Sequence, residues 1–170
     1  MGIRFDLIIS STIAGVIILM LFRVNTFMME TSVDNRLIHE MQNFADATAL
    51  LIQNELRSLE SIESLTDSTI RFATTEQDTI EIFKQGRDLI ILRKDVATLM
   101  TETEEYAARL HSLSFTPKKT NNEEALNIAN AAIIHFRVVT ETTPEQHVGG
   151  KGQIQAYAEK QIYLRNIFYE

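Results

Sequence analysis

The sequence predicts an α+β protein in which one long N-terminal helix packs on a mostly antiparallel β-sheet. Residues 4–62 contain an apolar run followed by an amphipathic stripe, with no proline among them. From residue 69 onward, apolar residues alternate with polar ones, which is the pattern of half-buried strands. A helix stripe and an apolar sheet face both need to be covered, and packing one on the other satisfies both requirements.

The first element is an apolar run, residues 7–22, which separates Asp6 from Arg23. A spanning helix usually needs roughly 17–25 residues, and this run approaches that length when Phe5 is added and Arg23 reaches the membrane interface. We predict a membrane helix that is retained in the mature protein. A cleaved secretory signal is the alternative. It is disfavoured because Arg4 is offset by Asp6 and no small-residue cleavage site follows the run.

The apolar run continues into an amphipathic segment without a proline or glycine between them. The stripe follows steps of three and four, the spacing of one helix face, and consists of Leu37, Met41, Phe44, Thr48, Leu51, Ile52, Leu56 and Leu59. We predict one helix over about 4–62, roughly 85–90 Å long at 1.5 Å per residue. Its acidic residues Glu55, Glu60 and Glu63, with Arg57, are expected on a wet face. A helix hairpin in a bundle is the alternative, but it needs a second amphipathic helix, and the sequence offers no convincing one.

The second half contains six segments with the character of strands. They are residues 69–74, 79–84, 89–94, 108–117, 131–142 and 159–170. Gly86 lies in the turn between the second and third segments, which predicts a β-hairpin there. Loops are expected at 95–106, 117–127 and 143–153. The predicted domains are therefore the membrane half of the helix (3–29), its amphipathic half (30–62) and a sheet domain (63–170).

The composition excludes several classes of function. A net charge of −7 disfavours nucleic-acid binding, which needs a basic face. The lack of cysteine excludes disulfides, thiolate metal sites and cysteine nucleophiles. None of the four histidines has a metal-ligand spacing, and the loop "HVGGKGQ" does not satisfy the phosphate-loop pattern. Glu102, Glu104 and Glu105 are interpreted as a solvated acidic loop rather than a Ca²⁺ site. We therefore expect no metal, no cofactor and no enzymatic activity.

The order of these elements resembles that of type IV pilin-like proteins, which have a short leader ending in glycine, an apolar helix, an amphipathic continuation and a C-terminal sheet. A narrower resemblance is to minor pilins and J-type (W-type) minor pseudopilins of type IV pilus or type II secretion systems. It is carried by the order of five segments: "NELRSLESIESLTDSTIRFATTEQDTIEIFKQG", "LIILRK", "LHSLSFTPKK", "AAIIHFRVVTET" and "QIYLRN". The whole resemblance, the N-terminal helix included, covers most of the chain, although each motif alone is weakly specific.

This resemblance implies that residues 1–2 are a leader, cleaved between Gly2 and Ile3. The family places a glutamate at the fifth mature residue, where it pairs with the N-terminal amine of a neighbouring subunit. That position is Leu7 here, and the nearest acid is Asp6. The leader also lacks the usual basic residues, and the stem lacks the proline that is common in the family. The resemblance therefore implies a straighter stem whose processing and pairing depart from the usual pattern.

The function implied is assembly as a structural subunit of a filament, with the C-terminal domain outside the cytoplasm and the helix in the inner membrane. Expected partners are other pilin or pseudopilin subunits, an inner-membrane assembly platform, a prepilin peptidase and membrane lipid. Close approach of stems depends on small residues, which here are Ser10, Ser11, Ala14 and Gly15. The alternatives are a single-pass, membrane-tethered accessory or ligand-binding protein and an anchored enzyme. The latter is disfavoured because no nucleophile and base can be named.

Overall fold

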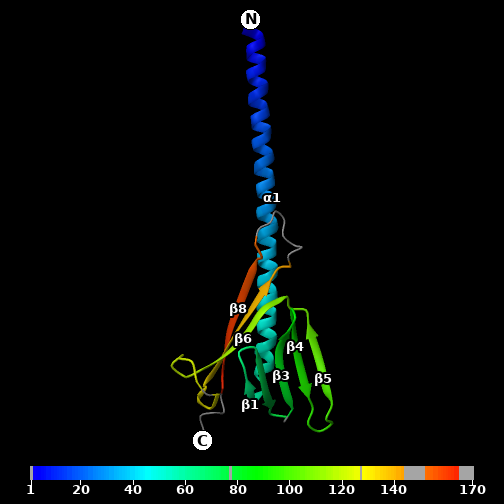
Figure 1. Cartoon of the computed structure of the whole chain (residues 1–170), viewed down its shortest axis with the longest axis vertical. Helices are drawn as coiled ribbons and strands as arrows, with labels where there is room; N and C mark the ends of the chain where they lie inside the picture. The colour runs from blue at the N-terminus through cyan, green and yellow to red at the C-terminus, as the bar shows by residue number, and fades with distance from the viewer. Residues whose placement is uncertain (1, 77, 127, 144–151, 165–170) are drawn as a thin grey trace. The chain divides into compact units, whose positions relative to one another are not determined.

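This computed structural model describes residues 2–76, 78–126, 128–143 and 152–164, with residues 2–8 and 129 described by their backbone only. The chain forms two compact units, Met1–Leu37 and Ile38–Glu170. The elements in chain order are α1 (Gly2–Leu56), β1 (Leu59–Leu65), β2 (Thr69–Thr74), β3 (Thr79–Gln85), β4 (Asp88–Lys94), β5 (Thr101–Tyr106), β6 (Leu110–Lys118), the 3₁₀ turn η1 (Ile128–Asn130), β7 (Ile133–Glu141) and β8 (Gln155–Tyr163), as Figure 1 shows. The predicted α+β class is confirmed.

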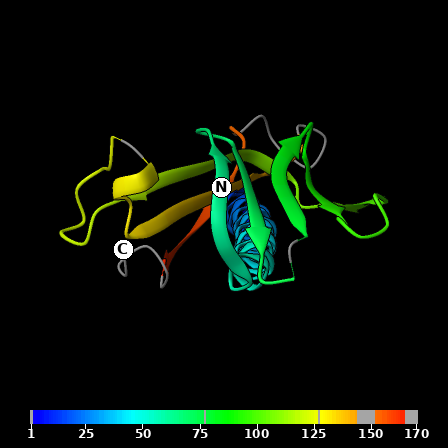
Figure 2. The same ribbon diagram turned by 90° about the horizontal axis from the view of Figure 1, so that it is seen from below.

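The strands form two antiparallel sheets, where the sequence had suggested one. The larger sheet has the order β1-β2-β3-β4-β5, and the smaller has the order β6-β7-β8. Two backbone hydrogen bonds link β6 to the larger sheet: Phe115 N–H donates to Asp67 O at 2.9 Å, and Leu110 N–H donates to Arg87 O at 2.7 Å. Figure 2, which looks along α1, shows strands of both sheets around the helix.

One hydrophobic core joins the helix to both sheets. The residues of α1 in this core are Ala45, Ala49, Ile52 and Leu56. In two of the segments predicted as strands, the alternating apolar residues are buried: Ile70 and Phe72 on β2, and Ile134, Phe136 and Val138 on β7. Most of the predicted helix stripe is buried: Leu37, Met41, Thr48, Ile52 and Leu56 are buried, Phe44 and Leu51 are half-buried, and Leu59 lies in β1 instead. Ala45 and Ala49, which are also buried, were not predicted.

The predicted hairpin at Gly86 is also confirmed. β3 pairs with β4 without a register shift, from Thr79↔Lys94 to Gln85↔Asp88. A turn of two residues closes this hairpin, and Gly86 adopts a φ of 62° there. That positive φ is costly for residues that carry a Cβ atom. Glycine at the first central position is the usual requirement of a type II′ turn, whose twist matches that of the strands.

The prediction that the helix runs to residue 62 is wrong, because α1 ends at Leu56 and β1 begins at Leu59. β1 turns Leu59, Ile62 and Leu65 toward the core at steps of three residues. Two register shifts cause this spacing, since each places an extra residue in β1 opposite β2. A strand with two bulges thus shows the apolar spacing of a helix.

The expected wet helix face around Glu55 is also corrected. Glu60 and Glu63 belong to β1, where Glu63 Oε2 accepts a hydrogen bond from Arg71 Nε at 2.7 Å. The side chain of Glu55 is only 16% exposed and forms an ion pair with Arg93, with 2.7 Å between Oε1 and Nη2. Burial alone would lower the pKa of Arg93, but the attraction of Glu55 and of Glu104 raises it above its ordinary value.

Three further boundaries differ from those predicted. Residues 101–106, expected within a loop, form β5, which is polar on both faces and largely exposed. The loop expected from 117 begins after Lys118, where β6 ends. The closing strand begins at Gln155 rather than at 159. Its first buried residues, Ala156 and Ala158, are small, and the sequence therefore gave little apolar signal for this part of the strand. Most of the loop predicted at 143–153 and the end of the strand predicted at 159–170 lie outside the described residues.

Candidate membrane and assembly helix

The N-terminal unit offers an exposed apolar helix surface. From Ile9 to Met29 every side chain is exposed, and the large apolar ones include Leu19 at 67% and Phe22 at 66%. Among the described helices, α1 is the one long and apolar enough to cross a membrane. Residues 7–29 contain a single charged residue, Arg23. At 1.5 Å per residue they extend about 34 Å, which exceeds the hydrocarbon thickness of about 30 Å.

Two threonine side chains, Thr26 within this segment and Thr31 just after it, bond to the backbone of the same helix. The Thr26 hydroxyl donates to Phe22 O at 2.9 Å, and the Thr31 hydroxyl donates to Phe27 O at 2.8 Å. Such bonds to the carbonyl four residues earlier satisfy a hydroxyl without water. A lipid environment requires that backbone and hydroxyl groups make their hydrogen bonds within the helix.

The predicted small residues fall on one strip of this helix. In α1, Ser10 lies one turn before Ala14, and Ser11 lies one turn before Gly15, so the four positions form a small-xxx-small surface. All four are exposed. A Cβ atom added at Gly15 would meet no other atom within 4 Å. The structure therefore brings Ser10, Ser11, Ala14 and Gly15 together on one exposed strip of α1.

The predicted leader boundary and its acid lie at the start of the same helix. The backbone is helical from Gly2 through Ile3 and Asp6. The side chains of these residues lie outside the described part of the structure. Cleavage between Gly2 and Ile3 and the pairing of Asp6 with a neighbouring amine therefore stay predictions.

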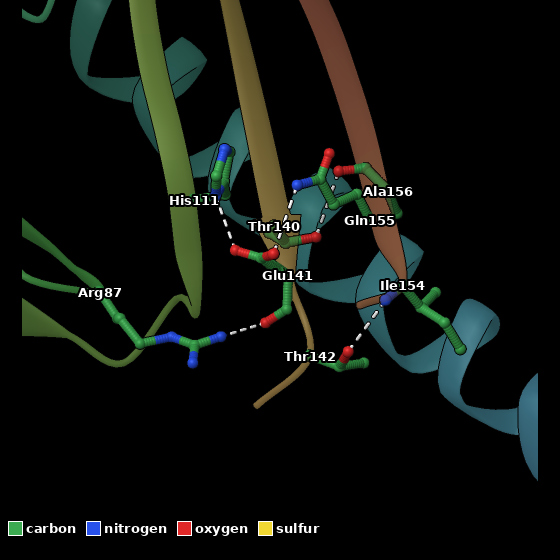
Figure 3. Close-up of polar contacts among 8 residues, drawn as sticks. All are labelled: Arg87, His111, Thr140, Glu141, Thr142, Ile154, Gln155 and Ala156. Carbon is green, nitrogen blue, oxygen red and sulfur yellow. Dashed lines mark hydrogen bonds and ion pairs between the residues drawn. The ribbon is translucent and has the colours of Figure 1, made fainter. Parts of the chain in front are cut away.

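A polar cluster at the ends of β6, β7 and β8 is a second candidate site that the sequence did not predict (Figure 3). His111 Nδ1 lies 2.6 Å from Glu141 Oε2, and Gln155 Nε2 donates to the other carboxylate oxygen at 3.4 Å. The Arg87 guanidinium donates to the Glu141 carbonyl. The sequence shows His111 only as an isolated histidine, because its partner Glu141 lies thirty residues further along the chain.

The geometry of this cluster indicates a structural clasp. Thr142 N–H donates to Ile154 O at 3.0 Å, and Ile154 N–H donates back to the Thr142 hydroxyl at 3.0 Å, so the chain is pinned on both sides of residues 143–153. The buried Thr140 hydroxyl donates to Met41 O of α1 at 2.8 Å. In a catalytic triad, a histidine oriented by a carboxylate is also hydrogen-bonded to a nucleophilic hydroxyl. Within the described residues, His111 makes no hydrogen bond to a hydroxyl.

The other residues considered for chemistry are dispersed. His135 Nε2 lies 3.6 Å from Glu159, which also pairs with Arg137. Glu104 accepts a hydrogen bond from Tyr106 Oη at 2.7 Å, which raises the pKa of that phenol. The described residues contain no group of three side chains placed to hold a metal ion. His147 lies outside the described residues.

Comparison with protein-family models, with curated proteins and with solved structures finds no match to this chain.

Proposed function

We propose that this protein is a structural subunit of a helical filament, of the minor pilin or pseudopilin kind, which assembles through the apolar half of α1. One observation carries the proposal. A single helix joins a fully exposed apolar segment, residues 9–29, to a segment whose stripe from Met41 to Leu56 is buried in the folded unit. The exposed half has the composition to reside in lipid and then to exchange lipid for neighbouring stems.

The subunit acts by assembly. The filament arises when identical or related stems pack side by side in a heterologous, head-to-tail arrangement, which propagates instead of closing. Small residues on a stem allow close approach, and this requirement assigns a role to Ser10, Ser11, Ala14 and Gly15. The partners proposed are other subunits of the filament, its inner-membrane assembly platform and a prepilin peptidase that cuts between Gly2 and Ile3.

The test is incorporation of stem variants into filaments. Gly15→Leu adds bulk to the small-residue patch, whereas Val16→Leu adds bulk at the next position, about 100° around the helix. Because Gly15 has open space around it, neither change should unfold the protein. We expect the Gly15 variant to disappear from sheared and purified filaments, while the Val16 variant is recovered at the wild-type level.

Three readouts complete this experiment. Circular dichroism of both purified variants checks that the folded unit is intact. Intact mass and N-terminal sequencing of the membrane-extracted protein show whether the new N-terminus is Ile3. A wild-type protein that stays in the membrane fraction with Met1 or Gly2 retained would contradict the proposal and favour a tethered accessory protein.

A further inference from the structure

The strand β5 is an open sheet edge that differs from the other three edges of the two sheets. Strand β1 carries two register shifts, and β6 carries one and also contains Pro117. Register shifts and proline both hinder the pairing of a further strand at an edge. On β8, the carbonyl of Tyr157 accepts a hydrogen bond from Gln42 of α1 at 3.3 Å. By contrast, β5 pairs with β4 at six consecutive positions without a shift. Figures 1 and 2 show it at the outside of its sheet.

The register identifies the backbone groups that face outward from β5. Asp95 N–H donates to Met100 O at 3.1 Å, which makes these residues a hydrogen-bonded pair at the turn. Bonded and non-bonded pairs alternate along an antiparallel ladder. The N–H and C=O groups of Thr101, Thr103 and Glu105 therefore point away from β4. They make no other hydrogen bond within the described residues, and so they form a template for one more strand.

The charge of β5 indicates which strand this edge accepts. Its sequence, "TETEEY", has three glutamates and no basic residue. Arg93 and Tyr106 contact Glu104, but Glu102 and Glu105 form no ion pair in the described structure. Like charges opposite each other on neighbouring strands are destabilising. Two copies of β5 would repel each other, whereas a strand with lysine or arginine would be attracted.

An exposed apolar tip adjoins this edge. Leu99 and Met100, in the turn before β5, are 74% and 73% exposed, and Val96 is 50% exposed. The turn is fixed by Asp95, whose carboxylate accepts bonds from the backbone of Ala97 at 2.7 Å and from the Thr98 hydroxyl at 2.6 Å. Leu99 is held at a φ of 55°, which is uncommon for a bulky residue. Large apolar side chains held by a fixed turn can anchor a partner.

We propose that β5 is a docking edge for an extended segment of a different polypeptide, which adds a sixth strand to the larger sheet. Glu102 and Glu105 lie on opposite faces of β5, because side chains alternate along a strand. The incoming segment carries lysine or arginine near one or both of them, and an apolar side chain against the tip formed by Val96, Leu99 and Met100. Strand addition of this kind draws affinity from main-chain hydrogen bonds and specificity from alternate side chains. This proposal does not depend on filament assembly, because it concerns only the folded unit.

The first experiment measures peptide binding to the full chain in zwitterionic detergent by fluorescence anisotropy. The probe is a labelled ten-residue peptide of alternating lysine and valine, and the matched control replaces each lysine by glutamate. We expect the lysine peptide to bind about tenfold or more tightly than the glutamate peptide, since each cross-strand charge pair contributes. Equal binding of the two peptides would overturn the proposal.

Variants then separate edge pairing from general charge attraction. Thr103→Pro removes an outward N–H without breaking the β4–β5 ladder, and we expect about five- to tenfold weaker binding. The matched Thr103→Ala variant keeps the N–H and should bind as the wild type does. The double variant E102K/E105K should prefer the glutamate peptide. If Thr103→Pro binds the lysine peptide unchanged, β5 is not the docking edge.

A peptide control covers the case in which Thr103→Pro does not fold. A lysine peptide N-methylated at every residue cannot donate hydrogen bonds from either of its edges, and it should lose binding to the wild-type protein. Retained binding of this peptide would overturn strand addition. Filament incorporation of E102K/E105K at the wild-type level would show that this site and the stem act separately.

Discussion

At the scale of single residues, Asp95 determines the turn that joins β4 to β5. Its carboxylate accepts bonds from the hydroxyl of Thr98 and from the backbone N–H groups of Ala97 and Thr98. These three bonds favour the charged carboxylate, and they lower its pKa below the ordinary value. The turn is therefore stabilised by a group that titrates in acid.

The sign of the resulting pH dependence follows from the lowered pKa. The stabilising contribution of Asp95 is complete above the pKa of an unfolded aspartate, about 3.9, and it is lost as the pH falls through the lower pKa of the folded protein. We expect Asp95→Ala to destabilise the protein at neutral pH, and the difference from wild type to shrink in strong acid. Urea unfolding at a series of pH values measures it. A difference that does not change with pH would contradict this assignment.

At the scale of elements, the contact between α1 and the sheets depends on small helix residues. Ala45 and Ala49 are completely buried, whereas Ala47, on the opposite side of the helix, is exposed. Alanine at the contact allows the helix backbone to lie close to the strands, and the larger Ile52 and Leu56 fill the space one and two turns later.

This arrangement predicts different costs for the same substitution at neighbouring positions. Ala49→Leu inserts a side chain into a filled interface and should lower the free energy of unfolding by about 1–3 kcal/mol. Ala47→Leu adds the same atoms on the exposed side and should change it by less than about 0.5 kcal/mol. Denaturant unfolding of both variants measures the contrast. Equal effects would mean that the helix faces are assigned wrongly.

Elements with a regular apolar period were predictable, and elements with an interrupted period were not. Strand β2 alternates along its whole length, and β7 alternates from Ile134 onward, because each buries one face there. On β6, simple alternation would place Leu110 on the face opposite to that of Leu113 and Phe115. A register shift next to His111 brings all three to the buried side. A bulge moves the side chains of all residues beyond it to the other face of the sheet. The period of apolar residues in the sequence does not by itself show where a bulge occurs.

The apolar half of α1 could be predicted because its signal is its composition. The contacts around Glu141 and the open edge of β5 could not be predicted. An apolar run with one charge is visible in a single chain segment. The His111–Glu141 contact and the open edge of β5 arise from pairing between distant segments. β5 itself has no apolar face, so it gave no strand signal.

At the scale of the whole molecule, the chain consists of a unit with an exposed apolar surface and a unit with its own core. The core residues of α1 begin at Met41, apart from Leu37 at its margin. Residues 1–29 contribute no side chain to the core within the described structure. The second unit thus has the features of an independently folding domain.

We expect removal of residues 1–29 to convert the protein from a membrane-associated form to a soluble form with the same unfolding midpoint. Ultracentrifugation of cell lysates measures the partition, and thermal unfolding compares the midpoints. The control removes residues 1–44, which deletes Met41 and Phe44, and it should unfold at a clearly lower temperature. Aggregation of the 30–170 chain, or a strongly lowered midpoint, would contradict the division into two units.

The unbroken course of α1 has a mechanical consequence. The same helix that presents the apolar segment also contributes the buried residues from Met41 to Leu56. A pull along the axis of this buried segment would load the side-chain contacts of its four helical turns in shear and at the same time, instead of separating them one after another. The segment is thus suited to bear tension along its axis.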